Sequence, residues 1–382
     1  MYMSSVILIT YSNYPNGSAS AIRYANFAAT LTDMEYEVIV FCKSSSNPNK
    51  INNIHVESFT NVNKYNRLFL FPYRAIKRLK QIMLTKKISG VLLGSDLITL
   101  HAYQIQKWCN SNGINCVFDT TEWYSKEQFN NWIFSFPYWD KTILNKCVIT
   151  KQSRVIAISS FLYDYFKAKG AKVVKVPIFY NRRYRVTPFT SREIQDYKIK
   201  IIYAGSHLLM DNIPLIVKAI ALLPHSIRSK VEFVIYGLSQ EQIKSCLPQE
   251  ILAEAKDALV IKGQRPNCEV IEAYQSADYS IVLRNPSLRV NKAGFPSKVV
   301  ESMRLGVPVI CNYSSDLDKY IISGFNGIII DNLCAEAISN QIRILTTLTR
   351  EEKLIMGRNA IDTVDSKLNS RLFEMDLNTI LN

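Results

Sequence analysis

The part of the chain best suited to bind an anion is the stretch from Arg284 to Ile310. Four basic residues in it precede its first acid, Glu301. These cations are Arg284, Arg289, Lys292 and Lys298. Lys298 is the most informative, because a cation in the first turn of a helix faces the positive end of the helix dipole and is normally disfavoured there. A phosphate or diphosphate, held by helix N–H groups and by convergent Arg and Lys side chains, would relieve that cost. The alternative is a solvated basic loop followed by an ordinary surface helix.

The flanking residues predict the elements that position these cations. The apolar run Tyr279 to Leu283 predicts a buried strand. Pro296 suits the first turn of a helix, because its fixed φ is helical and its missing N–H has no partner there. The helix is expected from about Ser297 to Leu305 and ends at Gly306. A second strand, Val307 to Ile310, follows, so the unit is strand, basic loop, helix, strand.

The segment AGFPSKVVESMRLGVPVI resembles the donor-binding signature of retaining GT-B glycosyltransferases of family 4, in the branch that makes bacterial surface polysaccharides. The resemblance implies that Arg284 and Lys298 neutralise a leaving nucleotide diphosphate and that Glu301 accepts hydrogen bonds from ribose hydroxyls. Five more residues are implied for donor binding here: Gly294, Phe295, Pro296, Ser297 and Arg289. The family usually carries a second, sugar-contacting glutamate where this chain has Ala293, so the sugar is left open.

A second segment, KIIYAGSHLLMDNIPLIVKAI, resembles the first donor-domain loop of the same family. The resemblance implies donor contacts from Gly205, Ser206 and His207. The basic residues that usually follow the glycine are missing, and we expect Arg284 and Arg289 to replace them.

Two further donor positions are implied at other strand ends. Gln264 follows Gly263, where the backbone of the resembled family holds the base. In the first half, the loop after a strand at Val6 to Thr10 contains Gly17 and Ser18, whose backbone would close over the donor phosphates and the acceptor. A tight strand-to-helix turn is the alternative for that loop, which contains no GxGxxG.

The acceptor candidates are two acids in DTTEWY, which ends a predicted strand at Asn115 to Asp119. Open α/β sheets bind ligands at strand carboxyl ends, so Asp119 and Glu122 are candidates for holding acceptor hydroxyls. The alternative for Asp119 is a helix cap. The segment Phe129 to Trp139, FNNWIFSFPYW, either lines an acceptor or lipid groove or packs in the core, and core packing is the expectation for so many rings.

Strands and helices alternate twice along the chain, which predicts an α/β protein of two Rossmann-like domains with parallel sheets, the GT-B arrangement with the domains facing across a cleft. We expect an acceptor-binding domain at residues 1–185 and a linker at 186–198. A donor-binding domain at 199–365 and a C-terminal helix at 366–382, crossing back to the first domain, complete the chain.

The 382 residues carry a net charge of +14, which would attract nucleic acid, anionic lipid or a phosphorylated substrate. No RRM, KH or zinc-finger pattern is present, so we expect no nucleic-acid partner. Residues 64–87 contain eight basic residues and no acid, interleaved with apolar ones. This pattern predicts a helix lying on an anionic membrane surface, or alternatively a packed helix with a solvated basic face. No transmembrane run or signal peptide is recognisable. We expect a cytoplasmic protein, peripheral at the inner face of the plasma membrane if this segment binds lipid.

No metal or other cofactor is expected. Asp316–Leu317–Asp318 spells the DxD motif of another glycosyltransferase class, but it follows a predicted strand and is expected to cap a helix. The four histidines lack zinc spacing. The eight cysteines form no CxxC pair and are expected to be buried, reduced thiols.

The resemblance therefore predicts a retaining, metal-independent glycosyltransferase. It would move a sugar from a UDP- or GDP-sugar to a lipid-linked or growing saccharide in the synthesis of a capsule, O-antigen or exopolysaccharide. One alternative is another enzyme of the same fold, either a nucleotide-sugar epimerase or an inverting transferase with Glu122 as its base. The other is a non-catalytic nucleotide-sugar-binding partner in a polysaccharide assembly complex, consistent with Ala293.

Overall fold

The computed structural model describes residues 4–15, 18–45, 49–51, 54–59, 64–184 and 198–382. The chain divides into two compact units. Unit 1 comprises Met1–Arg185, Lys292–Phe295 and Leu368–Asn382, and unit 2 comprises Val186–Asn291 and Pro296–Lys367. The expected linker at 186–198 lies outside the described residues, apart from its last residue.

Unit 1 is built on an eight-stranded sheet in which only the edge strand β5 runs antiparallel to its neighbour. The central strands are continuously apolar because both faces of a parallel sheet are covered. A separate pair joins β2 (Asn13–Tyr14) to β4 (Ser44–Ser45). In spatial order, the sheet consists of β10 (Lys172–Lys175), β9 (Arg154–Ala157), β8 (Asn115–Thr120), β7 (Ile88–Leu93), β1 (Ser5–Ile9), β3 (Glu37–Cys42), β6 (Ile54–Ser58) and β5 (Asn49–Ile51).

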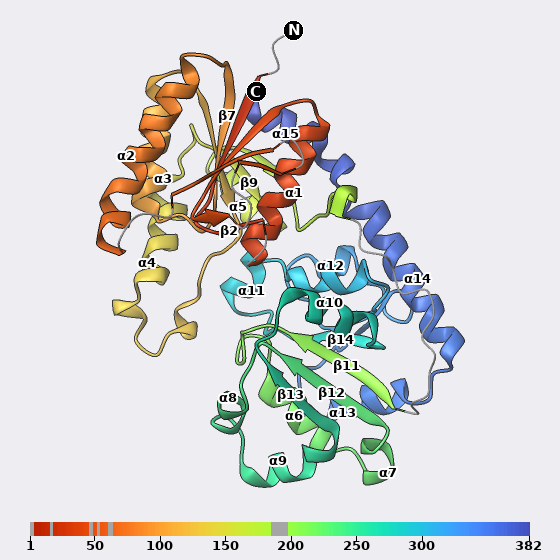
Figure 1. Cartoon of the computed structure of the whole chain (residues 1–382). Coiled ribbons are helices and arrows are strands. Elements are labelled where there is room, and N and C mark those ends of the chain that lie inside the picture. Colours follow the sequence, from red (N-terminus) through yellow and green to blue (C-terminus); the bar gives the residue numbers. More distant parts are fainter. Residues whose placement is uncertain (1–3, 16–17, 46–48, 52–53, 60–63, 185–197) are drawn as a thin grey trace. The chain divides into compact units, whose positions relative to one another are not determined.

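Helices cover both faces of this sheet (Figure 1). On one face, α1 and α15 share a core with alternate residues of the strands, such as Val6 and Leu8 of β1. The C-terminal helix thus packs into unit 1 through Leu377 and Ile380. The helical segments of unit 1 are α1 (Ala19–Asp33), α2 (Lys64–Met83), α3 (Thr99–Ser111), η1 (Lys126–Gln128), η2 (Trp132–Phe134), α4 (Phe136–Ile143), η3 (Leu144–Val148), α5 (Ser160–Ala168), η4 (Arg182–Tyr184), η7 (Ser370–Phe373) and α15 (Glu374–Leu381).

Unit 2 contains a six-stranded, fully parallel sheet. The chain enters at β11, builds β12 and β13 on one side of it, and then returns to build β14, β15 and β16 on the other side. The switch point therefore lies between β11 and β14, and the carboxyl ends of strands at a switch point are where open α/β sheets bind ligands. In spatial order, the strands are β13 (Leu259–Gly263), β12 (Val231–Tyr236), β11 (Ile199–Ala204), β14 (Tyr279–Val282), β15 (Val309–Cys311) and β16 (Gly327–Ile329).

Two helical layers enclose the sheet of unit 2 (Figure 1). One layer is formed by α6, α9 and α13, and the other by α10, α12 and α14. The helical segments of unit 2 are α6 (Ile213–Ala221), α7 (His225–Arg228), α8 (Gln240–Lys244), α9 (Gln249–Ala255), η5 (Lys256–Ala258), α10 (Asn267–Gln275), α12 (Ser297–Met303), η6 (Leu317–Lys319), α13 (Ala335–Leu345) and α14 (Arg350–Lys367), and α11 (Arg289–Ala293) spans the boundary between the units.

Two sequence-based expectations about side-chain burial are wrong. The rings of Phe134 and Phe136 are exposed, so the aromatic segment 129–139 is not packed in the core. Cys147 and Cys268 are exposed, although all eight cysteines are free.

The structure favours the packed-helix alternative for α2. Phe71, Ala75 and Leu79 are buried along one face, whereas Lys77 and Lys80 are exposed on the other. Within the described residues, no helix is long and apolar enough to cross a membrane.

Candidate functional site

A buried carboxylate, Asp211, lies at the switch point of unit 2 and holds two cations. Arg284 Nε donates to Asp211 Oδ1 at 2.8 Å, and Lys298 Nζ donates to Oδ2 at 2.7 Å. The hydroxyl of Tyr203 also donates to Oδ2, at 2.8 Å. We call these four residues the Asp211 cluster. The Asp211 side chain has no solvent exposure, so every partner of its charge comes from the chain.

The sheet topology brings the members of the cluster together. Tyr203 is on β11, and Asp211 lies in the loop that leads from β11 to α6. Arg284 follows β14, the neighbour of β11, and Lys298 lies in the first turn of α12. The carboxylate therefore supplies the negative charge that offsets the unfavourable position of Lys298 at a helix N-terminus. The sequence predicted that an anion is needed there, and the structure shows that the chain itself provides one.

Gly205 makes room for the cluster. A side chain at this position would overlap the end of Lys298 and would place its Cβ 2.8 Å from Tyr203 Oη. A Cβ at Gly237 would in turn lie 2.6 Å from the carbonyl oxygen of Gly205. Glycines follow or end three adjacent strands, at 205, 237 and 263, and Gly237 lets its backbone lie close to that of Gly205.

Electrostatics fix the charge state of the cluster. Burial tends to raise the pKa of Asp211, but Lys298 and then Arg284 outweigh it and hold the pKa well below its usual value. Burial and the Asp211 charge together raise the pKa of Tyr203, so its hydroxyl stays protonated and donates. With one carboxylate and two cations, the cluster has a net charge of one positive unit at neutral pH. The Nη1 and Nη2 atoms of Arg284 have no hydrogen-bond partner among the described residues, which leaves them available to an anion.

Two asparagines hold the backbone that carries Arg284. Asn312 Oδ1 accepts from the Arg284 N–H at 2.8 Å, and Asn312 Nδ2 donates to the Arg284 carbonyl at 2.7 Å. Asn212 Nδ2 donates to the carbonyl of Leu283 at 2.9 Å. Because β14 ends at Val282, these side chains replace the ladder hydrogen bonds that the strand no longer makes.

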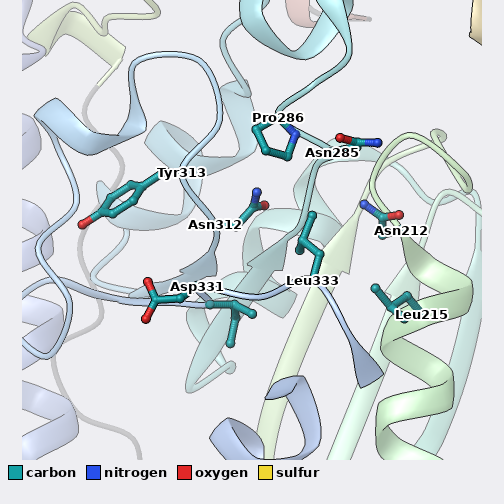
Figure 2. A pocket seen from close by; sticks show the side chains of 9 residues that line it. Asn212, Leu215, Asn285, Pro286, Asn312, Tyr313, Asp331 and Leu333 are labelled. Atoms are coloured by element: carbon teal, nitrogen blue, oxygen red, sulfur yellow. The ribbon is translucent and has the colours of Figure 1, made fainter. Parts of the chain in front are cut away.

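A pocket of about 440 Å³ opens beside this backbone, at the carboxyl ends of β14, β15 and β16 (Figure 2). Asn212 and Asn312 form part of its wall, together with Asn285, Tyr313 and Asp331. Two residues of the pocket wall are connected to the Asp211 cluster. Asn212 directly follows Asp211 in the sequence, and Asn312 is hydrogen-bonded to the backbone of Arg284.

Glu301 lies one turn beyond Lys298 on α12 and is half-buried. Its carboxylate has no hydrogen bond or ion pair with the described part of the chain. Burial and then the charge of Glu301 raise the pKa of the buried Tyr274. A carboxylate without a partner beside a cationic cluster is able to accept hydrogen bonds from hydroxyl groups of a ligand.

The remaining donor candidates lie on the surrounding loops. Ser206 and His207 are exposed after β11, and Gln264 is exposed after β13. Arg289 begins α11, and Pro296 is the N-cap of α12, not its first helical residue. Ser297 begins α12, whereas Gly294 and Phe295 group with unit 1.

The sequence suggested that Asp119 holds an acceptor hydroxyl, but its partner in the structure is the side chain of Arg23. Its buried carboxylate forms a two-bonded ion pair with Arg23, through Nε at 2.9 Å and Nη2 at 2.8 Å. Arg23 also donates to the carbonyls of Val176 and Pro177. This ion pair joins α1 to the sheet, so Asp119 offers no oxygen to solvent and caps no helix.

The other candidates of unit 1 lie at its surface. Glu122 is exposed and accepts a hydrogen bond from the Tyr124 hydroxyl. Ser18 is the N-cap of α1, with its hydroxyl accepting from the N–H of Ala21 at 3.1 Å. Gly17 lies outside the described residues.

The DxD sequence, Asp316–Leu317–Asp318, follows β15 and overlaps η6. Asp316 precedes η6 and makes an ion pair with Lys319 at 3.2 Å, without a side-chain cap bond to the helix. In the described ranges, no group of three or more His, Cys, Asp or Glu side chains is arranged to hold a metal ion.

Comparisons with known proteins agree with this architecture. Residues 188–363, just under half of the chain, match the family model described as Glycosyl transferases group 1. A curated relative, an uncharacterized glycosyltransferase of Methanocaldococcus jannaschii, is 22% identical over 241 residues. That match covers 61% of this chain and 58% of the relative, so the chain spans less than two thirds of the length of that relative.

Solved structures match over nearly the whole chain. Anabaena HepE in complex with UDP and glucose has a TM-score of 0.69 at 12% identity, and the match covers 99% of each chain. Sucrose-phosphate synthase from Thermosynechococcus elongatus has a TM-score of 0.69 at 16% identity, with 99% of this chain and 98% of that chain covered. WaaG, a glycosyltransferase involved in lipopolysaccharide biosynthesis, has a TM-score of 0.66 at 14% identity, with coverage of 98% and 99%. The chain has the two-domain α/β fold with parallel sheets of GT-B glycosyltransferases.

Replacing Asp211 by Asn tests the charge state of the cluster. The pKa of Asp211 is lower in the folded chain than in the unfolded chain, where it is about 3.9. Its ion pairs therefore stabilise the folded state above that pH, and this stabilisation is lost as the pH falls. We expect Asp211→Asn to lower the free energy of unfolding by about 3–5 kcal/mol near neutral pH, because two cations lose their buried partner. The deficit should shrink below about pH 4, as measured by urea unfolding.

The exposed Asp257 provides the control, since Asp257→Asn should leave the pH profile unchanged. A deficit for Asp211→Asn that stays constant from neutral to acid pH would contradict the charge state assigned to Asp211.

Replacing Asn312 by Ala tests whether its side chain positions Arg284. Buried Asn326 offers a matched control, because its side chain also joins two backbone groups of unit 2, the N–H of Ile322 at 2.8 Å and the carbonyl of Tyr320 at 2.9 Å. Each Ala variant should lose about 1–3 kcal/mol of stability. Only Asn312→Ala should also weaken the binding of UDP, used as the probe and measured by calorimetry. Equal effects of the two variants on UDP binding would rule out a positioning role.

Proposed function

We propose that the protein is a retaining, metal-independent glycosyltransferase that transfers a sugar from a nucleotide diphosphate sugar, UDP-linked or GDP-linked, to a saccharide. The match to Glycosyl transferases group 1 and the GT-B fold support glycosyl transfer. The observation that carries the proposal is the Asp211 cluster, which places a net positive charge and two uncommitted Arg284 nitrogens at the switch point of unit 2.

In this proposal, the cluster binds the diphosphate and stabilises it as it leaves. The bond between the anomeric carbon and the diphosphate oxygen breaks, and negative charge accumulates on that oxygen. Arg284 and Lys298 are fixed by Asp211 before the reaction, so they can stabilise this charge without reorganising. Glu301 accepts hydrogen bonds from the ribose hydroxyls, and the loop residues Gly205, Ser206 and Gln264 border the nucleotide.

The acceptor hydroxyl attacks the same face of the sugar that the diphosphate leaves. Its oxygen forms the new bond to the anomeric carbon, and its proton passes to an oxygen of the departing diphosphate. No protein base is required for this step, which is consistent with the burial of Asp119 in its ion pair with Arg23.

The similarity to WaaG and to HepE supports a role in bacterial surface polysaccharide synthesis and a UDP-sugar donor. WaaG is described as involved in lipopolysaccharide biosynthesis, and HepE was solved with UDP and glucose. We propose a lipid-linked or growing saccharide as the acceptor.

A second candidate function is a non-catalytic partner that binds nucleotide sugars. Ala293 stands where the resembled family has a glutamate for the sugar, and Asp211 already compensates one of the two cationic charges. A protein of this kind would bind a nucleotide diphosphate without transferring the sugar.

The proposed donor site is tested by thermal unfolding with UDP, GDP and ADP, with and without a chelator. A ligand that binds the folded state raises its apparent stability. We expect one nucleotide diphosphate to raise Tm independently of the chelator, and Glu301→Ala to lose this shift. Glu336→Ala is the matched control, because Glu336 is an exposed acid in the first turn of another helix of unit 2, α13. The absence of a shift with every nucleotide would refute the donor site.

Once the nucleotide is known, transfer from its sugars to a saccharide acceptor is followed by NMR of the anomeric proton. A product with the anomeric configuration of the donor supports retention, and an inverted product refutes it. Binding of the nucleotide without transfer from any of its sugars would favour the non-catalytic alternative.

A further inference from the structure

The pocket of about 440 Å³ in unit 2 is lined by none of the four residues of the Asp211 cluster. Its walls come from the loops that follow three adjacent parallel strands, β14, β15 and β16, and from the start of α6 (Figure 2). All of these elements belong to unit 2. Small-molecule sites in proteins have volumes of about 300–1,000 Å³, so this pocket has room for a small ligand of its own.

Hydrogen bonds hold the walls of this pocket in place. Asn291 Nδ2 donates to the carbonyl of Asn285 at 2.9 Å, and Asn312 fixes the backbone of the residue that precedes Asn285. The N–H of Ile330 donates to the carbonyl of Cys311 at 2.7 Å, which ties the chain after β16 to the end of β15. A ligand would therefore enter a cavity that is already formed, and little of the chain would have to be ordered on binding.

Several polar groups of the lining have hydrogen-bonding capacity left. Asn285 Oδ1 accepts from a backbone N–H at 3.0 Å, whereas its Nδ2 has no partner among the described residues. Asn212 is the converse case, because its Nδ2 donates to a backbone carbonyl at 2.9 Å and its Oδ1 has no partner in the described ranges. The exposed Asp331 carboxylate and Tyr313 hydroxyl likewise make no hydrogen bond to the described part of the chain. The pocket thus offers both donors and acceptors to a ligand.

The charge of the lining excludes several classes of ligand. Among the described residues that line the pocket, Asp331 carries the only charge. A phosphate, a nucleotide or an acidic sugar would meet this carboxylate without any lining cation to pair with it. A divalent metal ion prefers several oxygen ligands, and no group of three or more His, Cys, Asp or Glu in the described ranges is arranged to hold one. A neutral ligand fits best.

The remaining lining is apolar, and Leu215 and Leu333 are part of it. Figure 2 shows Asp331 and Tyr313 on one side of the pocket and Asn212 with Leu215 on the other. The free acceptors of Asp331 and Asn212 are therefore on opposite walls, and the ligand must donate hydrogen bonds on opposite sides. The hydroxyls around a sugar ring do so, and its C–H groups suit the apolar lining. A nucleobase carries its amino and imino donors on one edge and fits less well.

We propose that this pocket binds a neutral sugar unit, with Asn212, Asn285 and Asp331 hydrogen-bonded to its hydroxyls. The site is separate from the Asp211 cluster, which is cationic and suits a diphosphate. The inference does not rest on the proposed function, since sugar binding here needs neither a nucleotide nor transfer.

Saturation-transfer NMR on the full chain tests this site, with the methyl glycosides of glucose, galactose and N-acetylglucosamine as probes. We expect at least one glycoside to bind and UDP not to displace it. Titration of that glycoside should give a Kd at least about tenfold higher for Asp331→Ala, because hydrogen bonds to a charged acceptor are lost. Asn285→Ala should weaken binding to a smaller extent, since it removes a neutral donor.

The matched control is Asp257→Ala. Asp257 is an exposed acid of the same unit, and it precedes β13, so it lies at the opposite edge of the same parallel sheet. This variant should bind the glycoside like the wild type. Asp331 and Asn285 are exposed, so circular dichroism should show all variants folded.

Equal binding by the wild type, Asp331→Ala and Asn285→Ala would overturn the proposal, as would the absence of saturation transfer from every glycoside. Competitive displacement of the glycoside by UDP would assign the sugar to the nucleotide site and also overturn it. Binding of uridine or adenosine in place of the glycosides, lost in Asp331→Ala, would make the pocket a nucleoside site and refute it. A chain that binds a glycoside but no nucleotide would contradict only the proposed function.

Discussion

The structure of unit 2 depends on the burial of one carboxylate. An ionised Asp211 without solvent contact would be strongly unfavourable unless opposite charges and hydrogen bonds compensated it. Three side chains do so: Tyr203 on β11, Arg284 in the loop after β14 and Lys298 in the first turn of α12. The requirement to satisfy this carboxylate therefore fixes where the loop after β14 and the start of α12 lie relative to the switch point.

The same arrangement explains several neighbouring residues. Gly205 must lack a side chain because Lys298 passes over it to reach Asp211. Asn312 must reach the backbone of Arg284 because that residue lies beyond the end of β14. The result is a preorganised cationic site in a half of the chain that is neutral as a whole. An anion would therefore be recognised there by local geometry and not by the net charge of that half.

Much of the fold could be predicted from the sequence, because parallel strands buried on both faces are continuous apolar runs. The strands predicted at Asn115 to Asp119 and at Tyr279 to Leu283 match β8 and β14 to within one residue at each end. Lys298 could be singled out because its position contradicts the helix dipole. Its partner could not be found, since Asp211 lies 87 residues away and a lone acid before a helix resembles an ordinary cap. The topology of the sheet, which local patterns do not encode, brings the two together.

Asp119 and the aromatic segment 129–139 show the same limitation. An acid at the end of a strand has the composition of a ligand site, but it is Arg23, 96 residues away, that satisfies Asp119. Aromatic residues at 129–139 have the composition of a core, and their exposure depends on what packs beside them. In both segments, the composition indicates which interactions the side chains are able to make. The tertiary contacts determine which of these interactions they do make.

The central claim is that the Asp211 cluster receives the diphosphate of a nucleotide. Calorimetric titration of uridine, UMP and UDP into the wild type and Arg284→Gln tests it most directly, because the three ligands differ only in phosphate. We expect the wild type to bind UDP at least about tenfold more tightly than UMP, from charge-assisted hydrogen bonds to the second phosphate. The Arg284→Gln variant should lose this difference while binding uridine as before. An unchanged preference for UDP over UMP in Arg284→Gln would contradict the account.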